Sequence, residues 1–129
     1  MKVHHVGYYV TDIDEARNEF LSLGYVKESD CIIDGERKIT VQFLKNDTYR
    51  VELVAPAEGC ALFPKSIKKM GATPYHICYE CAEIEKAISE WQEQGCLLVR
   101  PPNPAVAIEN RRVAFLYSDA VGMIELVEI

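Results

Sequence analysis

An internal repeat constrains the fold of this chain more than any other feature. Residues 75–95 repeat the landmarks of the first 24 residues: His5 and Gly24 recur as His76 and Gly95, each 71 positions later. Further matched pairs at the same offset are Tyr8 and Tyr79, Ile13 and Ile84, and Ala16 and Ala87. Residues 41–54 recur as 113–127, at an offset of 72 and then 73. Repetition of this kind indicates a fold built from copies of one supersecondary unit.

Each copy predicts a strand, a helix and three further strands. Residues 3–10 are rich in β-branched and aromatic side chains, as strands are. Asp12 or Asp14 can cap a helix whose apolar positions recur at helical spacing until Gly24 ends it. The other predicted strands are 25–33, 37–44 and 49–54 in the first copy, and 75–81, 96–99, 111–117 and 123–128 in the second, with a helix at 83–94.

Two stretches connect these elements. Residues 62–70 have a short helical pattern that Gly71 ends, and we expect a linker helix within residues 60–72. Residues 100–107 contain three prolines, so we expect a loop there, and such a loop can serve as a lid. The predicted fold is therefore α+β, one domain over residues 1–129, made of βαβββ modules at 1–59 and 73–129.

Composition excludes several classes of protein. The net charge of −6 argues against nucleic acid as the main partner, because no basic stripe offsets phosphate repulsion. No apolar run has the roughly 20 residues that a membrane span needs, and no signal-peptide pattern opens the chain. The five cysteines are an odd number, which favours reduced thiols and a cytoplasmic protein over a disulfide framework.

The repeat equates two pairs of possible metal ligands. His5 matches His76 on the first strand of each module, and Glu52 matches Glu125 on the last. If the sheet curls so that these strands face one another, two imidazoles and two carboxylates converge on one point. Such a set suits one divalent metal ion: Zn, Ni, Co, Mn or Fe. His4 is expected to face the other way, because neighbouring strand residues alternate sides.

Strand alternation also nominates residues for binding a substrate. Tyr9, Cys78 and Glu80 share the faces of the two histidines, and Arg50 shares that of Glu52. Gln42 takes a position expected to face the same side. Arg112 is a candidate anchor for a carboxylate or phosphate, and solvated charges near a loop are an equal alternative.

Four runs of sequence resemble the vicinal oxygen chelate superfamily, which includes glyoxalase I (lactoylglutathione lyase), methylmalonyl-CoA epimerase, extradiol dioxygenases and bleomycin resistance proteins. The runs are 4–7 (HHVG), 51–56 (VELVAP), 75–80 (YHICYE) and 124–128 (IELVE). The resemblance covers essentially the whole chain. It implies a mixed sheet curled around a metal-centred cleft, a homodimer, and four ligands: His5, Glu52, His76 and Glu125.

The resemblance also implies an activity. It indicates a metal-dependent lyase or isomerase that removes and returns a proton next to the carbonyl of a small-molecule or thioester substrate, with Glu125 as the preferred catalytic base and Glu52 as the second. Some epimerases have Gln at the Glu52 position and a separate Glu base, which this chain lacks. The alternatives are an Fe(II) extradiol-type dioxygenase, and a non-catalytic small-molecule binding or resistance protein.

Overall fold

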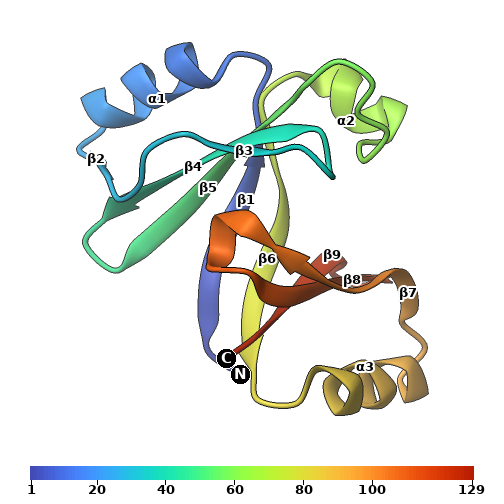
Figure 1. Ribbon diagram of the computed structural model, residues 1–129. Helices are drawn as coiled ribbons and strands as arrows, with labels where there is room; N and C mark the ends of the chain where they lie inside the picture. The colour runs from blue at the N-terminus through green and yellow to red at the C-terminus, as the bar shows by residue number, and fades with distance from the viewer. The chain divides into compact units, whose positions relative to one another are not determined.

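The computed structural model describes residues 1–129, with nine strands and three α-helices (Figure 1). The chain forms two compact units. The N-terminal unit is Val6–Tyr75, and the C-terminal unit consists of Met1–His5 together with His76–Ile129. Strand β1 (Val3–Tyr9) therefore contributes residues to both. The predicted α+β class, with repeated β and α elements in a mixed sheet, is confirmed.

In the N-terminal unit, β1 runs parallel to β5 (Tyr49–Pro56), and β4 (Ile39–Asn46) pairs antiparallel with the other side of β5. The predicted strand over residues 25–33 is instead two short strands, β2 (Val26–Lys27) and β3 (Ile32–Asp34), both antiparallel to β4. The break between β2 and β3 has its cause in the pairing with β4. The amides of Glu28 and Ser29 both donate to the carbonyl of Phe43, so the ladder cannot continue in register.

Helix α1 (Ile13–Ser22) covers one face of this sheet. Asp12 is its N-cap, and its side chain accepts a hydrogen bond from the Glu15 amide at 3.0 Å. The helix ends before Gly24, whose φ of +99° is a conformation that glycine adopts without strain. The core beneath α1 is formed by Val10, Leu44, Val51, Leu53 and Ala55, with Ile13, Ala16 and Phe20 packed against it.

Helix α2 (Lys65–Met70) is shorter than the pattern over residues 62–70 predicts. Pro64 takes the N-cap position in an extended conformation, so the helix begins after it. Phe63 is buried, and its ring contacts those of Tyr9 and Tyr75. Phe63 thus anchors the segment before α2 to Tyr9 of β1 and to Tyr75.

In the C-terminal unit, β6 (Thr73–Cys81) runs parallel to β9 (Gly122–Glu128), and β8 (Arg111–Ser118) pairs antiparallel with β9. The Glu80 amide donates to the Lys2 carbonyl, so the start of the chain lies beside β6. Helix α3 (Ile84–Glu93) covers one face of this sheet (Figure 1). The core beneath it includes Ile84, Ile88, Ala114, Leu116, Ile124 and Leu126.

The prediction of a loop over residues 100–107 is wrong. Strand β7 (Leu97–Ala105) runs through the prolines and pairs antiparallel with β8, with register shifts after Leu98 and Arg100. Within the C-terminal unit, β7 has only β8 as a neighbour and is therefore an edge strand. An edge strand tolerates prolines, because one side of its backbone needs no ladder partner. This segment is consequently part of the sheet, and the lid role falls with the loop.

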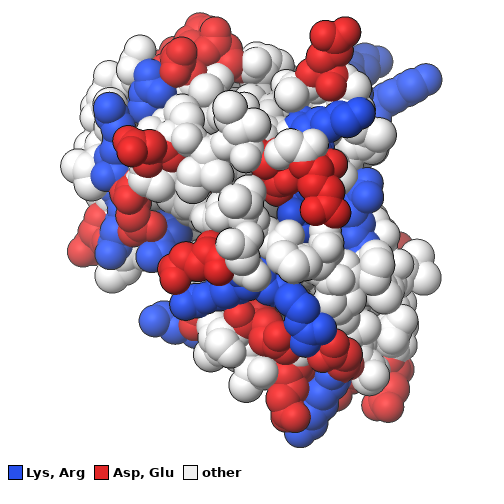
Figure 2. All heavy atoms as spheres, in the orientation of Figure 1, with Lys and Arg blue, Asp and Glu red and all other residues white.

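No helix of the protein is long and apolar enough to cross a membrane. On the face shown in Figure 2, basic and acidic side chains lie interspersed among uncharged ones.

Candidate metal centre

The possible metal ligands lie on the sheet faces that the helices leave uncovered. In the C-terminal unit, Ile124 and Leu126 of β9 pack in the core beneath α3, so Glu125 points to the opposite face. His76 of β6 lies on that same opposite face, because Tyr79 and Cys81 pack towards α3. The final residue that β1 contributes to this unit is His5.

Three of these side chains meet at one point in the C-terminal unit. His5 Nε2 lies 3.1 Å from His76 Nε2 and 3.2 Å from Glu125 Oε2. His76 Nε2 lies 2.7 Å from the same carboxylate oxygen. All three residues are almost fully buried, with exposed fractions of 1%, 4% and 3%. Two imidazoles and a carboxylate, brought together away from solvent, form what we call the His5–His76–Glu125 cluster.

The spacing of the three atoms fits a shared metal ion. Ligands bound at about 2.1 Å and at right angles are separated by about 3.0 Å, which is close to all three distances here. Glu125 Oε2 is buried and lies within ion-pair distance of both imidazoles. A buried carboxylate oxygen that faces two imidazole nitrogens is suited to bind a cation placed between them.

The electrostatics of the cluster favour an ionised carboxylate. Burial by itself raises the pKa of Glu125, but the charge and hydrogen bonding of His76 and His5 outweigh it and hold the pKa well below the ordinary value. Glu125 is therefore ionised at neutral pH, which is the form in which a carboxylate binds a divalent cation.

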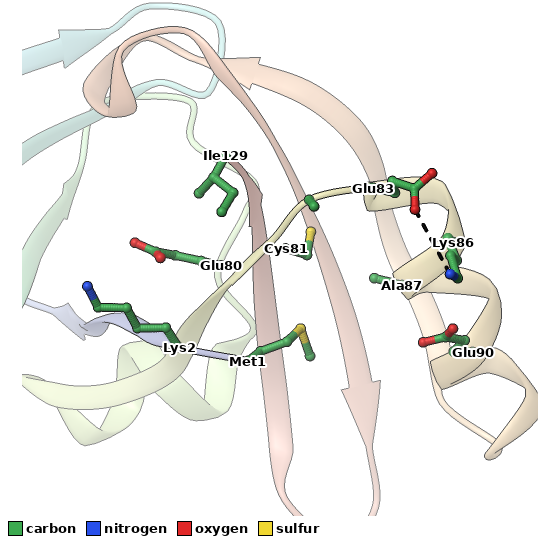
Figure 3. A pocket seen from close by; sticks show the side chains of 10 residues that line it. Met1, Lys2, Glu80, Cys81, Glu83, Lys86, Ala87, Glu90 and Ile129 are labelled. Carbon is green, nitrogen blue, oxygen red and sulfur yellow. Dashed lines mark ion pairs between the residues drawn. The ribbon is translucent and has the colours of Figure 1, made fainter.

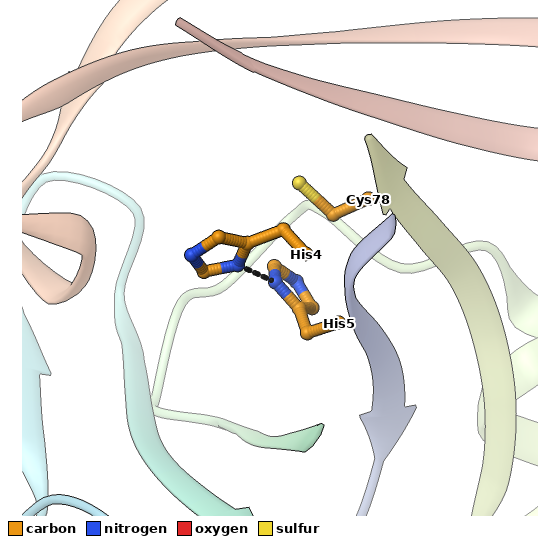
Figure 4. A group of neighbouring side chains, drawn as sticks. All are labelled: His4, His5 and Cys78. Atoms are coloured by element: carbon orange, nitrogen blue, oxygen red, sulfur yellow. Dashed lines mark hydrogen bonds between the residues drawn. The ribbon is translucent and has the colours of Figure 1, made fainter. Parts of the chain in front are cut away.

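His4 does not lie apart from the cluster, so the expectation that it faces away is wrong. Its Nδ1 lies 2.8 Å from His5 Nδ1, and the two rings meet edge to face with centroids 5.1 Å apart (Figure 4). Cys78 of β6 lies beside them, its sulfur within 4.8 Å of nitrogen atoms from both imidazoles. The contact with His4 is made by His5 Nδ1, whereas the His5–His76–Glu125 cluster is formed by His5 Nε2.

Glu52 lies in the N-terminal unit, on the face of β5 opposite α1. Its neighbours Val51 and Leu53 pack in the core beneath α1, which places Glu52 on the other side. It is 6% exposed and is paired in register with Gly7 of β1 and Phe43 of β4. Its role as the fourth ligand stays a prediction.

Two of the predicted substrate residues point the wrong way. Gln42 lies on the α1 face, because its register partner is Leu53 and Arg17 of α1 donates to its side-chain oxygen at 3.3 Å. Arg112 lies on the α3 face, where its guanidinium binds the carboxylates of Glu85 and Glu128. For the strand of Gln42 the alternation was predicted correctly, but the two faces were exchanged.

Of the other predicted substrate residues, Cys78 is fully buried and lies opposite Glu125 in the β6–β9 register. Tyr9 is buried against Phe63, and Arg50 pairs with Glu28 at 2.6 Å. Glu80 lines an open pocket of about 360 Å³ between the start of β1 and α3 (Figure 3). That pocket contains none of the three cluster residues, so its position says nothing about the metal centre.

Sequence reasoning missed one aromatic neighbour of the cluster. Phe115 of β8 packs edge to face on His76, with ring centroids 5.4 Å apart, and lies opposite Glu125 in register. The repeat held the signal, since Phe43 is the counterpart of Phe115 and lies opposite Glu52 in the same way. Each module therefore places a phenylalanine beside its glutamate.

The fold agrees with the comparisons to known proteins. Residues 4–115 match the model of the Glyoxalase/Bleomycin resistance protein/Dioxygenase superfamily, and the chain belongs to that family. No curated protein sequence matches significantly.

Solved structures share the fold over nearly the whole chain. A hypothetical protein of Bacillus halodurans C-125 is similar at 26% identity, with 99% of this chain and 94% of that chain covered and a TM-score of 0.85. Methylmalonyl-CoA epimerase of Mycobacterium tuberculosis is similar at 23% identity, with 98% of this chain and 86% of that chain covered and a TM-score of 0.81. A variant of the Streptomyces coelicolor methylmalonyl-CoA epimerase, in complex with 2-nitronate-propionyl-CoA, is similar at 20% identity. The match covers 99% of this chain and 96% of that chain, with a TM-score of 0.81.

Proposed function

We propose that this protein is a divalent-metal-dependent lyase or isomerase that removes and returns a proton next to a carbonyl group. The observation that carries the proposal is the convergence of His5 Nε2, His76 Nε2 and Glu125 Oε2 at mutual distances of 2.7 to 3.2 Å. Glu52 completes the ligand set, because the repeat makes it the counterpart of Glu125. With both imidazoles neutral, the two carboxylates balance the charge of a divalent ion in a buried site.

The residues divide the work as follows. When bound, the ion supplies Lewis-acid stabilisation for charge that develops on a carbonyl oxygen. Glu125 accepts the proton from the adjacent carbon, the electron pair of the broken C–H bond delocalises onto the carbonyl oxygen, and the same proton or one from Glu52 is then returned. Return to the opposite face yields the epimer, and return to a neighbouring carbon yields the glyoxalase-type product.

We propose a small carbonyl compound or a thioester as the substrate class, and a homodimer as the assembly. Two solved neighbours support a thioester, since they are a methylmalonyl-CoA epimerase with 2-nitronate-propionyl-CoA and one with methylmalonyl-CoA. The cytoplasm is the proposed location, on the basis of the unpaired cysteine count.

Exchange of substrate hydrogen with solvent deuterium tests the reaction. The metal-loaded protein is incubated in deuterium oxide with methylmalonyl-CoA or with the hemithioacetal of methylglyoxal and glutathione, and incorporation is followed by mass spectrometry. We expect incorporation into one of them, lost after chelation and in Glu125→Gln but kept in Glu90→Gln, an exposed control with the same charge change. Failure to exchange either substrate would overturn the proposed reaction for both named substrates.

A second candidate is an Fe(II) dioxygenase, which the His5–His76–Glu125 cluster favours in one respect. Two histidines and one carboxylate on one side of an iron ion are the ligand set of such enzymes. Glu52 as a fourth ligand argues against it, because oxygen and substrate need open positions. Oxygen uptake by the Fe(II)-loaded protein with a catechol would establish this candidate.

A non-catalytic binding protein is distinguished by metal analysis. A protein that only sequesters a small molecule needs no stoichiometric ion, so purified protein with one bound metal per chain, and loss of that metal in His76→Ala, would exclude it.

A further inference from the structure

His5 is held by a neighbour that comes directly before it in the chain. The side chains of adjacent strand residues normally point to opposite faces, yet His4 Nδ1 and His5 Nδ1 are 2.8 Å apart. The rings are nearly perpendicular, at 80°, so the in-plane lone pair of one nitrogen can be aimed at the other ring's N–H (Figure 4). A contact this short is a hydrogen bond, in which one Nδ1 donates and the other accepts.

The cluster decides which nitrogen donates. His5 Nε2 faces His76 Nε2 and Glu125 Oε2, and a nitrogen that binds a metal ion there must offer its lone pair rather than a proton. A neutral imidazole carries one ring proton, so that of His5 lies on Nδ1 and is donated to His4 Nδ1. His4, which accepts at Nδ1, then carries its own proton on Nε2.

We propose that His4 is a positioning residue that fixes the tautomer and ring orientation of the metal ligand His5. The inference rests on the proposed metal centre. In metalloproteins, the second ring nitrogen of a ligand histidine usually carries a proton and donates a hydrogen bond to a carboxylate, a backbone carbonyl or water. Here a second imidazole takes that place. As a neutral acceptor it orients His5 without adding a negative charge to a site that two glutamates already balance.

The same residues offer a competing arrangement. His4, His5 and Cys78 bring ligand atoms within 4.8 Å of one another, so a thiophilic ion bound to all three is the alternative. In that arrangement His4 is itself a ligand, and Cys78 is a thiolate. Cobalt(II) distinguishes the two, because coordination by a thiolate adds an intense charge-transfer absorption that nitrogen and oxygen ligands lack.

The first experiment reads the tautomers directly in the zinc-loaded wild-type protein. Two-bond ¹H–¹⁵N correlation spectra of ¹⁵N-histidine-labelled protein should show His5 protonated on Nδ1 and His4 protonated on Nε2. The opposite pattern, or a metal shift on a nitrogen of His4, would overturn the inference without any variant having to fold.

The second experiment measures cobalt affinity in His4→Phe and His4→Asn. Phe keeps the ring but cannot accept a hydrogen bond, and we expect affinity to fall about 10- to 100-fold. Asn offers a side-chain oxygen, and we expect it to restore most of the affinity. Wild-type affinity in His4→Phe, or a thiolate band that disappears in Cys78→Ser, would refute the positioning role. Failure of the proposed function is recognised separately, as cobalt binding that Glu125→Gln leaves unchanged.

Discussion

His76 Nε2 lies 2.7 Å from Glu125 Oε2, a contact between adjacent parallel strands that is buried on both sides. Parallel pairing of β6 and β9 puts an imidazole and a carboxylate next to each other from segments about fifty residues apart. The pair has the shortest contact in the candidate metal centre, and it supplies the first test of ligand identity.

We predict that Glu125→Gln lowers the affinity for a divalent metal by more than about 100-fold, since loss of an outer-shell partner alone commonly costs 10- to 100-fold. The amide has nearly the same shape but no charge. Isothermal titration with zinc or cobalt measures the change. Glu90→Gln, on the exposed side of α3, is the matched control and should bind as wild type does. Equal affinity in both variants would remove Glu125 from the ligand set.

Substitution of Glu52 and of Glu125 by Gln should have different effects on metal binding and on proton transfer. Glu125 contacts both imidazoles, whereas Glu52 is assigned to the ligand set by its repeat position. Since an amide oxygen can still bind a divalent ion and Glu125 keeps its charge, we predict that Glu52→Gln retains one metal per chain. If Glu52 is the second base, proton return to one face of the substrate carbon slows by at least about 100-fold in that variant. Metal content and stereospecific deuterium incorporation, measured on the same preparation, separate the two roles. A variant that loses its metal would assign Glu52 to binding alone.

Gln42 is predicted to matter for stability and not for turnover. Its side chain accepts from Arg17, and its amide donates to the Ser29 carbonyl at 3.0 Å, on the α1 face of the sheet. Gln42→Leu removes both of these part-buried hydrogen bonds, and we expect a loss of about 1–3 kcal/mol in the free energy of unfolding. Denaturant unfolding measures it. The rate of substrate deuterium exchange by the folded variant should equal that of wild type. A large fall in this rate would instead assign Gln42 to the substrate site.

Arg112 should stabilise the protein in a pH-dependent way. Hydrogen bonding to Arg112 lowers the pKa of Glu85 below its ordinary value of 4.5. Because the folded-state pKa is the lower one, the stabilisation is present above pH 4.5 and is lost as the pH falls through the folded-state value. We therefore expect Arg112→Met to be less stable than wild type near neutral pH and the difference to narrow below pH 4.5. Thermal unfolding at several pH values checks this, with Lys86→Met as the control. A constant difference would show that the charge pairing is irrelevant.

The prolines of β7 should protect an open sheet edge. An edge strand with free backbone donors invites pairing with another molecule, and proline has no N–H to offer. Leu97 and Val99 near the start of the strand are exposed, so the edge is apolar as well. We predict that the triple substitution Pro101→Thr, Pro102→Thr and Pro104→Thr increases self-association, as measured by light scattering at several protein concentrations. Unchanged association would indicate that the edge is protected in another way.

The sequence predicted the fold well because the repeat and the periodicities are local signals. The helix that Asp12 caps and Gly24 ends begins and stops within a residue or two of expectation. The β7 segment was misread because proline excludes a central strand but not an edge strand, and edge position depends on pairing far along the chain. The split between β2 and β3 was hidden for a similar reason, since it depends on the Phe43 carbonyl in another strand.

For the candidate site, residue type and repeat position nominated His5, His76 and Glu125, and the structure brings these three together. Face assignment failed where one residue of register mattered. Gln42 and Phe43 are neighbours on opposite faces, and polarity favoured the wrong one. His4 was missed because strict alternation describes ideal strands, whereas rotation of two imidazoles brings their Nδ1 atoms within 2.8 Å.

The proposal that His5 and His76 bind one ion has a consequence for the chain as a polymer. The two residues are 71 positions apart, so joint coordination closes a long loop, much as a disulfide does. The chain entropy that such a closure removes from the unfolded state is worth about 4 kcal/mol at 25 °C. Unlike a covalent bridge, this cross-link can be withdrawn by a chelator. The persistence of the folded protein would then follow the free concentration of the ion around it.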